Sequence, residues 1–173
     1  MRSVVVMGVS GCGKSSVGER LAAQRDWTYL EGDALHPPEN VAKMASGIPL
    51  SDEDRWPWLD RIGQELSRAA EKGETIVVTC SSLKKIYRDR MRKAAGGKLD
   101  FVFLQGSIDV LSARMAARKG HFMPPSLLES QLKTLENPVG EDGVVTISIE
   151  NTIEDIVAMA DHELKQRHKD AEE

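Results

Sequence analysis

The segment GVSGCGKSS, residues 8–16, is the clearest indication of the fold of this chain. It follows the short apolar run Ser3–Met7, which is typical of a buried strand, and leads into Lys14–Arg25, which has helical periodicity. The segment matches the pattern G-x-x-x-x-G-K-S/T in the strand–loop–helix context that gives this pattern its meaning. Glycines let backbone N–H groups point inward at phosphate oxygens, and the helix N-terminus adds positive potential. The segment therefore predicts a phosphate-binding loop for a nucleoside triphosphate, with a plain glycine-rich turn as the alternative.

Individual residues of this loop have expected roles in binding ATP and Mg²⁺. Lys14 is expected to reach the β- and γ-phosphates, and the Ser15 hydroxyl is expected to ligate Mg²⁺. Cys12 lies beside Lys14 near a helix N-terminus, which favours a reactive thiolate; a buried, inert thiol is the alternative. The residues predicted to contact the nucleotide are Gly8, Val9, Ser10, Gly11, Cys12, Gly13, Lys14, Ser15, Ser16 and Arg114.

Length, composition and charge limit the class of protein. The chain has 173 residues, of which 40% are hydrophobic and 29% charged, and this predicts one globular domain over residues 1–173. A net charge of -4 without a Lys/Arg-rich tract argues against nucleic acid as a partner. No apolar run approaches the ~20 residues of a membrane span, so we expect no membrane partner. Two cysteines are too few for a disulfide framework, and we expect reduced thiols in the cytoplasm.

Strand-like and helix-like segments alternate along the chain, which predicts an α/β fold with a buried parallel sheet. Ser51 and Asp54 are a capping pair for the long central helix, and Gly73 suits its end. Pro57 lies either early in that helix or at a break near it. The predicted strands are Ser3–Met7, Thr28–Leu30, Thr75–Cys80, Leu99–Leu104 and Val144–Ile149. The predicted helices are Lys14–Arg25, Asp54–Lys72, Leu83–Ala95, Ile108–Lys119 and Thr152–His168.

A carboxylate follows the second predicted strand. Asp33 lies where that strand ends, and open α/β sheets bind ligands at this end of their strands. It is expected to accept the proton of an attacking hydroxyl or to support the metal shell. The third strand ends in Cys80-Ser81-Ser82 without the aspartate that many phosphate-loop proteins carry there, so Asp33 is the leading carboxylate for the metal. The alternative is that Asp33 caps a turn or helix.

Several cationic side chains are candidates for binding an anionic acceptor. Lys84 and Arg88 are four residues apart and share a helix face. His36 precedes two prolines in the loop that carries Asp33, and Lys43 and Arg55 follow it. Each of these is alternatively an ordinary solvated or loop residue. The residues predicted to bind the acceptor are Asp33, His36, Lys43, Arg55, Lys84, Arg88 and His121.

The region of residues 118–136 has the pattern of a mobile lid. Arg114 and Arg118 share a helix face, Gly120 breaks that helix, and Pro124 and Pro125 begin a new segment. Closure of a lid excludes water, and Arg118 is expected to stabilise charge on the transferring phosphoryl group as a catalytic residue with Lys14 and Asp33. An exposed helix end followed by a loop is the alternative.

The chain lacks the features of other phosphate-loop classes. No asparagine precedes a lysine, so the guanine-recognition pattern N-K-x-D of regulatory GTPases is absent. Mechanical ATPases generally need a larger domain. A small-molecule kinase is therefore favoured, and a nucleotide-binding regulator without phosphotransfer is the alternative from another class.

Four stretches resemble the gluconate kinase (gluconokinase) family, which is related to shikimate and nucleoside monophosphate kinases. They are MGVSGCGKSS, EGDALHPPENVAKMASGIPLSDEDRWPWL, CSSLKKIYRDRMR and RKGHFMPPSLLESQLKTLE, within residues 4–138. The resemblance implies a three-layer P-loop kinase fold, with a five-stranded parallel sheet in the order 2-3-1-4-5. It also implies a homodimer that transfers the ATP γ-phosphate to the 6-hydroxyl of D-gluconate, giving 6-phosphogluconate. A relative that phosphorylates shikimate or a nucleotide is the nearest alternative.

Overall fold

The computed structural model describes residues 2–117, 126–170 and 172 of the chain. Its centre is a sheet of five parallel strands in the order β2-β3-β1-β4-β5, which confirms the predicted α/β fold and strand order. The strands are β1 (Ser3–Met7), β2 (Thr28–Leu30), β3 (Ile76–Thr79), β4 (Leu99–Gln105) and β5 (Val144–Ser148). Every residue of β1 is buried, as expected for a central strand that is covered on both faces.

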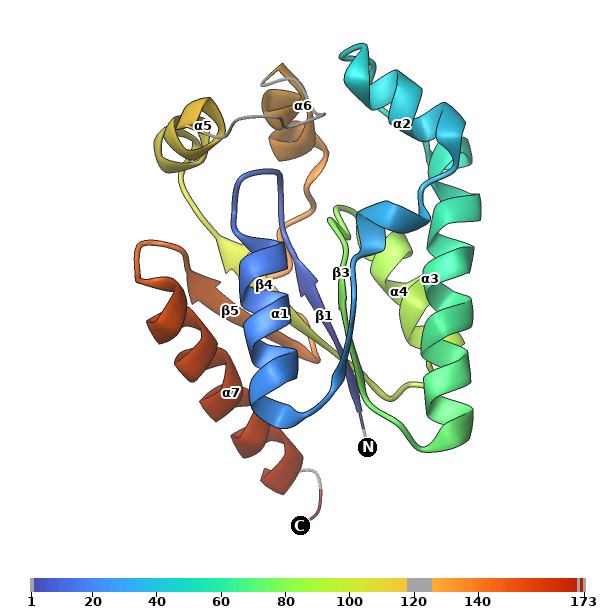
Figure 1. Ribbon diagram of the computed structural model, residues 1–173, viewed down its shortest axis with the longest axis vertical. Helices are drawn as coiled ribbons and strands as arrows, with labels where there is room; N and C mark the ends of the chain where they lie inside the picture. Colours follow the sequence, from blue (N-terminus) through green and yellow to red (C-terminus); the bar gives the residue numbers. More distant parts are fainter. Residues whose placement is uncertain (1, 118–125, 171, 173) are drawn as a thin grey trace.

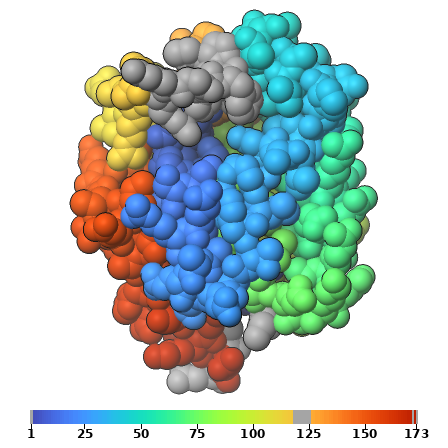
Figure 2. All heavy atoms as spheres, in the orientation of Figure 1, coloured from blue at the N-terminus to red at the C-terminus, as the bar shows by residue number. Residues whose placement is uncertain are grey.

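Helices cover both faces of this sheet (Figure 1). α1 packs against α7 on one face, and α3 packs against α4 on the other. Figure 2 shows α1 with α7 on one side and the segment that leads from β2 towards α2 on the other. The helices are α1 (Lys14–Arg25), the 3-10 helix η1 (Gly32–Leu35), α2 (Pro38–Ala45), α3 (Asp52–Lys72), α4 (Lys85–Ala94), α5 (Ile108–Ala117), α6 (Ser126–Thr134) and α7 (Ile153–Asp170). α2, α5 and α6 lie beyond the carboxyl ends of the strands, where ligands bind in open α/β sheets.

The start of α3 follows from its capping residues. The Ser51 side chain accepts a hydrogen bond from the Asp54 N–H, and the Asp54 carboxylate accepts one from the Ser51 N–H. Because Ser51 is the N-cap, α3 begins at Asp52, two residues earlier than predicted. Pro57 lies inside the helix rather than at a break. Its missing N–H leaves only the carbonyl of Glu53 without a helical donor, and Glu53 is exposed to solvent.

Other differences from the predicted elements arise near the ligand-binding end of the sheet. η1 and α2 are not among the predicted helices, because α2 is short and begins at Pro38, after a second proline. α4 begins at Lys85 instead of Leu83, since Lys84 is its extended N-cap residue. None of the described helices combines the length and apolar character needed to cross a membrane.

Candidate active site

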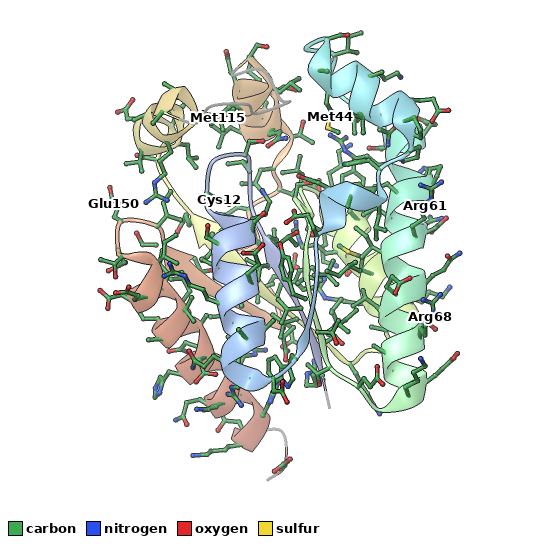
Figure 3. The ribbon with its side chains drawn as sticks, viewed as in Figure 1. Cys12, Met44, Arg61, Arg68, Met115 and Glu150 are labelled. Carbon is green, nitrogen blue, oxygen red and sulfur yellow. The ribbon has the colours of Figure 1, made fainter. Side chains whose placement is uncertain are left out.

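The loop between β1 and α1 has the backbone of a phosphate-binding loop. Gly8 and Gly13 have φ values of 146° and 92°, which side chains disfavour. A Cβ atom on Gly8 would lie 2.8 Å from the Cys12 Sγ and 3.0 Å from the Leu104 carbonyl oxygen, so the close approach requires glycine. Figure 3 shows Cys12 in this loop at the start of α1, near Met115 of α5. The loop therefore lies at the ligand-binding end of the central strand.

Lys14 turns back over this loop. Its Nζ donates hydrogen bonds to the carbonyl oxygens of Gly8 at 3.0 Å and Val9 at 3.1 Å. The Cys12 Sγ lies 3.9 Å from the same Nζ. Cys12 is only 1% exposed, and this burial favours the inert thiol over the reactive one.

A carboxylate that was not predicted from the sequence lies beside the phosphate loop. The Glu31 side chain, directly after β2, accepts hydrogen bonds from the Ser15 hydroxyl at 2.7 Å and from the Thr79 hydroxyl at 2.8 Å. The Tyr29 hydroxyl donates a third hydrogen bond to it. Burial acts to raise the pKa of Glu31, but these hydrogen bonds outweigh it and the pKa is lowered. Glu31 is therefore a charged carboxylate held at the Ser15 hydroxyl.

Glu31 is a second carboxylate to consider for the metal, beside the predicted Asp33. Asp33 was predicted to support the metal, yet Glu31 is the carboxylate that contacts Ser15. Asp33 instead lines the neighbouring cavity. A hydroxyl and a carboxylate are oxygen donors of the kind that Mg²⁺ prefers, alongside water and phosphate oxygens. The Ser15 hydroxyl and the Glu31 carboxylate are two such donors, and they fit a site that a nucleotide and Mg²⁺ would share. Among the described residues, no group of three or more His, Cys, Asp and Glu side chains could hold a metal ion.

The cavity next to the phosphate loop brings together residues that are distant in sequence. Ser10 and Lys14 of the loop line it with Asp33 of η1, and Arg55 of α3 also lines it. Its further lining includes His36, Met44, Leu50, Trp58, Ser81, Leu83, Leu127, Ser130 and Gln131. Figure 3 shows Met44 on α2, across the top of the sheet from Cys12. Residues predicted to bind the phosphates and residues predicted to bind the acceptor therefore line one cavity.

His36 presents a defined face to this cavity. The side-chain amide nitrogen of Asn40 donates to the Asp54 carbonyl oxygen at 2.8 Å and lies 3.2 Å from the His36 Nδ1. The carbonyl contact identifies this atom as a donor, so Nδ1 accepts and the ring proton lies on Nε2. The Nε2 atom is 4.0 Å from an Asp33 carboxylate oxygen. The ring stacks on Trp58 with centroids 3.9 Å apart. Burial, followed by the positive charge of Arg55, lowers the pKa of His36 to about 4.

The buried, neutral His36 predicts a pH-dependent stability. Its ordinary pKa is 6.5 and its pKa in the folded protein is about 4, so between these values the unfolded chain binds a proton that the folded chain does not. Stability is therefore lost as the pH falls from 6.5 towards 4. Between pH 7 and pH 5, the wild type is expected to lose about 2 kcal/mol more unfolding free energy than His36→Gln. Urea unfolding measures this, with the exposed His162→Gln as the control. An equal pH dependence in wild type and His36→Gln would contradict the assignment.

Arg88 does not line the cavity and is paired within the protein, which argues against its predicted role in binding the acceptor. Arg88 is 1% exposed. Its five N–H groups are all used: the Glu141 carboxylate accepts two at 2.9 Å, and backbone carbonyls accept the other three. The carbonyls belong to Ser82, Leu83 and Glu136. Arg88 therefore ties loops together and has no donor left for a substrate.

Two predicted lysines are paired outside the cavity. Lys43 donates to both carboxylate oxygens of Asp54, at 3.0 and 2.9 Å, and is not part of the described lining. Lys84 donates to Asp52 at 3.0 Å and lines a second, adjacent cavity. Arg55 borders both cavities.

Some predicted residues cannot be placed in the site. Arg118 and His121 lie outside the described residues, as does the first part of the predicted lid. Arg114 donates to the Ile149 carbonyl oxygen at 2.8 Å, just beyond the end of β5. Within the lid region, α6 is described, and its Gln131 side chain accepts a hydrogen bond from the Ser10 N–H of the phosphate loop at 2.8 Å. No local pattern in the sequence pointed to Gln131.

The strand order, the phosphate loop and the adjoining polar cavity define a P-loop kinase. The model of a family described as "AAA domain" matches residues 4–138. The chain belongs to the gluconokinase family. It is 47% identical to the gluconokinase of Gluconobacter oxydans (strain 621H) over 85% of this chain and 82% of that one. It is 45% identical to the thermosensitive gluconokinase of Escherichia coli (strain K12) over 89% and 82%. A crystal structure of a gluconokinase from Sinorhizobium meliloti 1021 is 52% identical, with a TM-score of 0.90 over 98% of this chain and 95% of that one.

Proposed function

We propose that this chain transfers the γ-phosphoryl group of ATP to the 6-hydroxyl of D-gluconate, giving ADP and 6-phospho-D-gluconate. The observation that carries the proposal is one cavity lined by Lys14 of the phosphate loop and by Asp33, His36 and Arg55. Lys14 suits a triphosphate, and the three residues from η1, its C-cap and α3 suit a polyhydroxy acid. Relatives named gluconokinase, at 45–52% identity over most of the chain, support gluconate as the acceptor.

The phosphate side of the reaction needs positioning and charge stabilisation more than covalent chemistry. Lys14 and the loop N–H groups bind the phosphates, and Ser15 with Glu31 would hold Mg²⁺ against them. When bound, Mg²⁺ neutralises charge on the phosphate oxygens. Arg114 and Arg118 keep their predicted roles at the nucleotide and the transferring group as part of this proposal, as does the lid over residues 118–136.

The acceptor side supplies a base. The 6-hydroxyl oxygen forms a bond to the γ-phosphorus, the bond from that phosphorus to the β,γ-bridging oxygen breaks, and ADP leaves. Asp33 accepts the hydroxyl proton in this step. The neutral His36 places its Nε2–H on the same side as the Asp33 carboxylate, where it can donate to a sugar hydroxyl.

Arg55 is the cation that we assign to the gluconate carboxylate. It is 8% exposed and lines the cavity. Among the described residues its guanidinium forms no ion pair, and the one hydrogen bond of this side chain goes to the Tyr87 hydroxyl. A buried charge of this kind is costly until an anion reaches it, so Arg55 favours an acceptor with a carboxylate.

A panel of acceptors tests this function. ATP-dependent ADP release is expected with D-gluconate and to be lower by about 10⁴-fold or more in kcat/KM with glucose, which closes into a ring and lacks the carboxylate. Shikimate, AMP and CMP are expected to give no release above buffer. Equal turnover of glucose and gluconate, or preference for shikimate or a nucleotide, would overturn the proposal. Release that no acceptor stimulates would identify a nucleotide-binding regulator instead.

The resemblance also leads us to propose a homodimer in the cytoplasm. Cys12 and Cys80 are both buried and free of disulfides, which is compatible with a reducing compartment. Light scattering of the purified chain tests the first statement, and imaging of the protein in its own cells tests the second.

A further inference from the structure

Arg55 reaches the acceptor cavity from α3, but the group that holds it comes from α4. The Arg55 Nη1 donates a hydrogen bond to the Tyr87 hydroxyl oxygen at 3.0 Å, and the guanidinium carbon lies 5.3 Å from the centre of the Tyr87 ring. Tyr87 is 1% exposed, so its ring cannot move without disturbing the core. The direction of the Arg55 side chain therefore depends on a residue that lies outside the cavity lining.

The Tyr87 hydroxyl is itself oriented by a carboxylate. It donates its proton to Asp52 at the start of α3, and Asp52 also accepts a hydrogen bond from the Lys84 Nζ at 3.0 Å. Because the hydroxyl proton points at Asp52, the hydroxyl lone pair is left to accept from Arg55. Hydrogen bonds from Tyr87 and then Lys84 lower the pKa of Asp52, which keeps it a charged acceptor.

Two buried arginines in this region show the difference between a structural cation and an available one. Arg88, on the same helix as Tyr87, is neutralised by the Glu141 carboxylate and donates all its protons within the protein. Arg55 donates instead to a neutral group, the Tyr87 hydroxyl. The Asp52 carboxylate accepts from that hydroxyl and is connected to Arg55 only through it. A direct Asp–Arg pair would compete with a substrate carboxylate, whereas a hydroxyl fixes the guanidinium without neutralising it.

We propose that Tyr87 and Asp52 are positioning residues that hold Arg55 ready for the carboxylate of the acceptor, so that this enzyme prefers anionic over neutral polyols. The proposal rests on the proposed function, because it takes the acceptor to be gluconate.

Tyr87→Phe tests the proposal, because it removes the hydroxyl and keeps the ring. The KM for gluconate is expected to rise about tenfold, within the range for a hydrogen bond to a charged group. The KM for ATP and the kcat are expected to stay within about twofold, since the phosphate side is untouched. Asp52→Asn is expected to act in the same direction, and it serves if Tyr87→Phe does not fold. Turnover of the neutral polyol D-glucitol is expected to be unchanged in both variants.

Asp60→Asn is the matched control. Asp60 on α3 pairs with Arg90 on α4 at 2.7 and 3.0 Å, so it joins the same two helices on the exposed surface. The Asp60→Asn variant is expected to leave the KM for gluconate unchanged.

In an Arg55→Ala background, Tyr87→Phe is expected to change kcat/KM for gluconate by less than about twofold, because the residue through which Tyr87 acts is gone.

These experiments distinguish a failure of the proposed function from a failure of the positioning role. If wild-type enzyme shows no gluconate-dependent ADP release, the proposed function is wrong. If wild type turns over gluconate but Tyr87→Phe keeps the wild-type KM, or loses gluconate and glucitol activity equally, the positioning role is wrong. Additive effects of Tyr87→Phe and Arg55→Ala would also overturn it.

Discussion

Lys14→Ala is expected to lower kcat with gluconate by about 10³-fold or more while the protein stays folded. In the structure, its ammonium group lies over the phosphate loop, where it donates to the Gly8 and Val9 carbonyl oxygens. When ATP is present, the same charge faces phosphate oxygens whose negative charge grows in the transition state. The loss is therefore expected mainly in kcat, with a smaller loss in ATP affinity.

The measurement is steady-state ADP release, together with thermal unfolding of the variant. Lys98→Ala is the control, because Lys98 is an exposed lysine in the loop before β4, at the opposite end of the sheet. A Lys14→Ala enzyme with kcat within tenfold of wild type would show that this loop does not carry the transferred phosphate.

Asp33→Asn is expected to lower kcat by about 10²–10⁴-fold, the range for a general base. The amide keeps the size of the side chain but cannot take the proton of the 6-hydroxyl. Because Glu31, rather than Asp33, contacts Ser15, the affinity for the nucleotide with Mg²⁺ is expected to change little. Asp60→Asn is the matched control, since it makes the same chemical change on an exposed helix face.

The alternative reading of Asp33 is a residue that only caps the turn of η1. Near wild-type kcat at saturating gluconate would support that reading and remove Asp33 from the mechanism. A fall in thermal stability without a fall in kcat would do the same.

The phosphate loop and the sheet were predictable because their signals are local. The run from Ser3 to Ser16 contains the strand, the glycines and the helix start in order, and each needs only its neighbours. The capping box of Ser51 and Asp54 is equally local, three residues across. Strand order came from the resemblance of whole stretches of sequence, because strand pairing joins residues that are far apart along the chain.

Local sequence signals did not show which charged side chains of the site are paired within the protein. Lys84 and Arg88 share a helix face in sequence, but the fate of Arg88 is decided by Glu141, 53 residues away. Arg55 is made available by Tyr87, which lies 32 residues further on. Glu31 had a detectable signal, since it directly follows β2 and lies two residues before Asp33, but nothing local showed that it would contact Ser15. Pairing across the fold, rather than residue type, decides which of these cations is neutralised within the protein.

The position of the phosphate in the product shows directly whether the enzyme phosphorylates the 6-hydroxyl of D-gluconate. Enzyme, MgATP and D-gluconate are incubated, and the product is examined by phosphorus and proton NMR. We expect one phosphorylated product, in which the phosphorus is coupled to the two hydrogens on carbon 6. Wild type is expected to form it, and Asp33→Asn is not expected to form it in the same time. A phosphate on any other carbon, or no phosphorylated gluconate at all, would contradict transfer to the 6-hydroxyl.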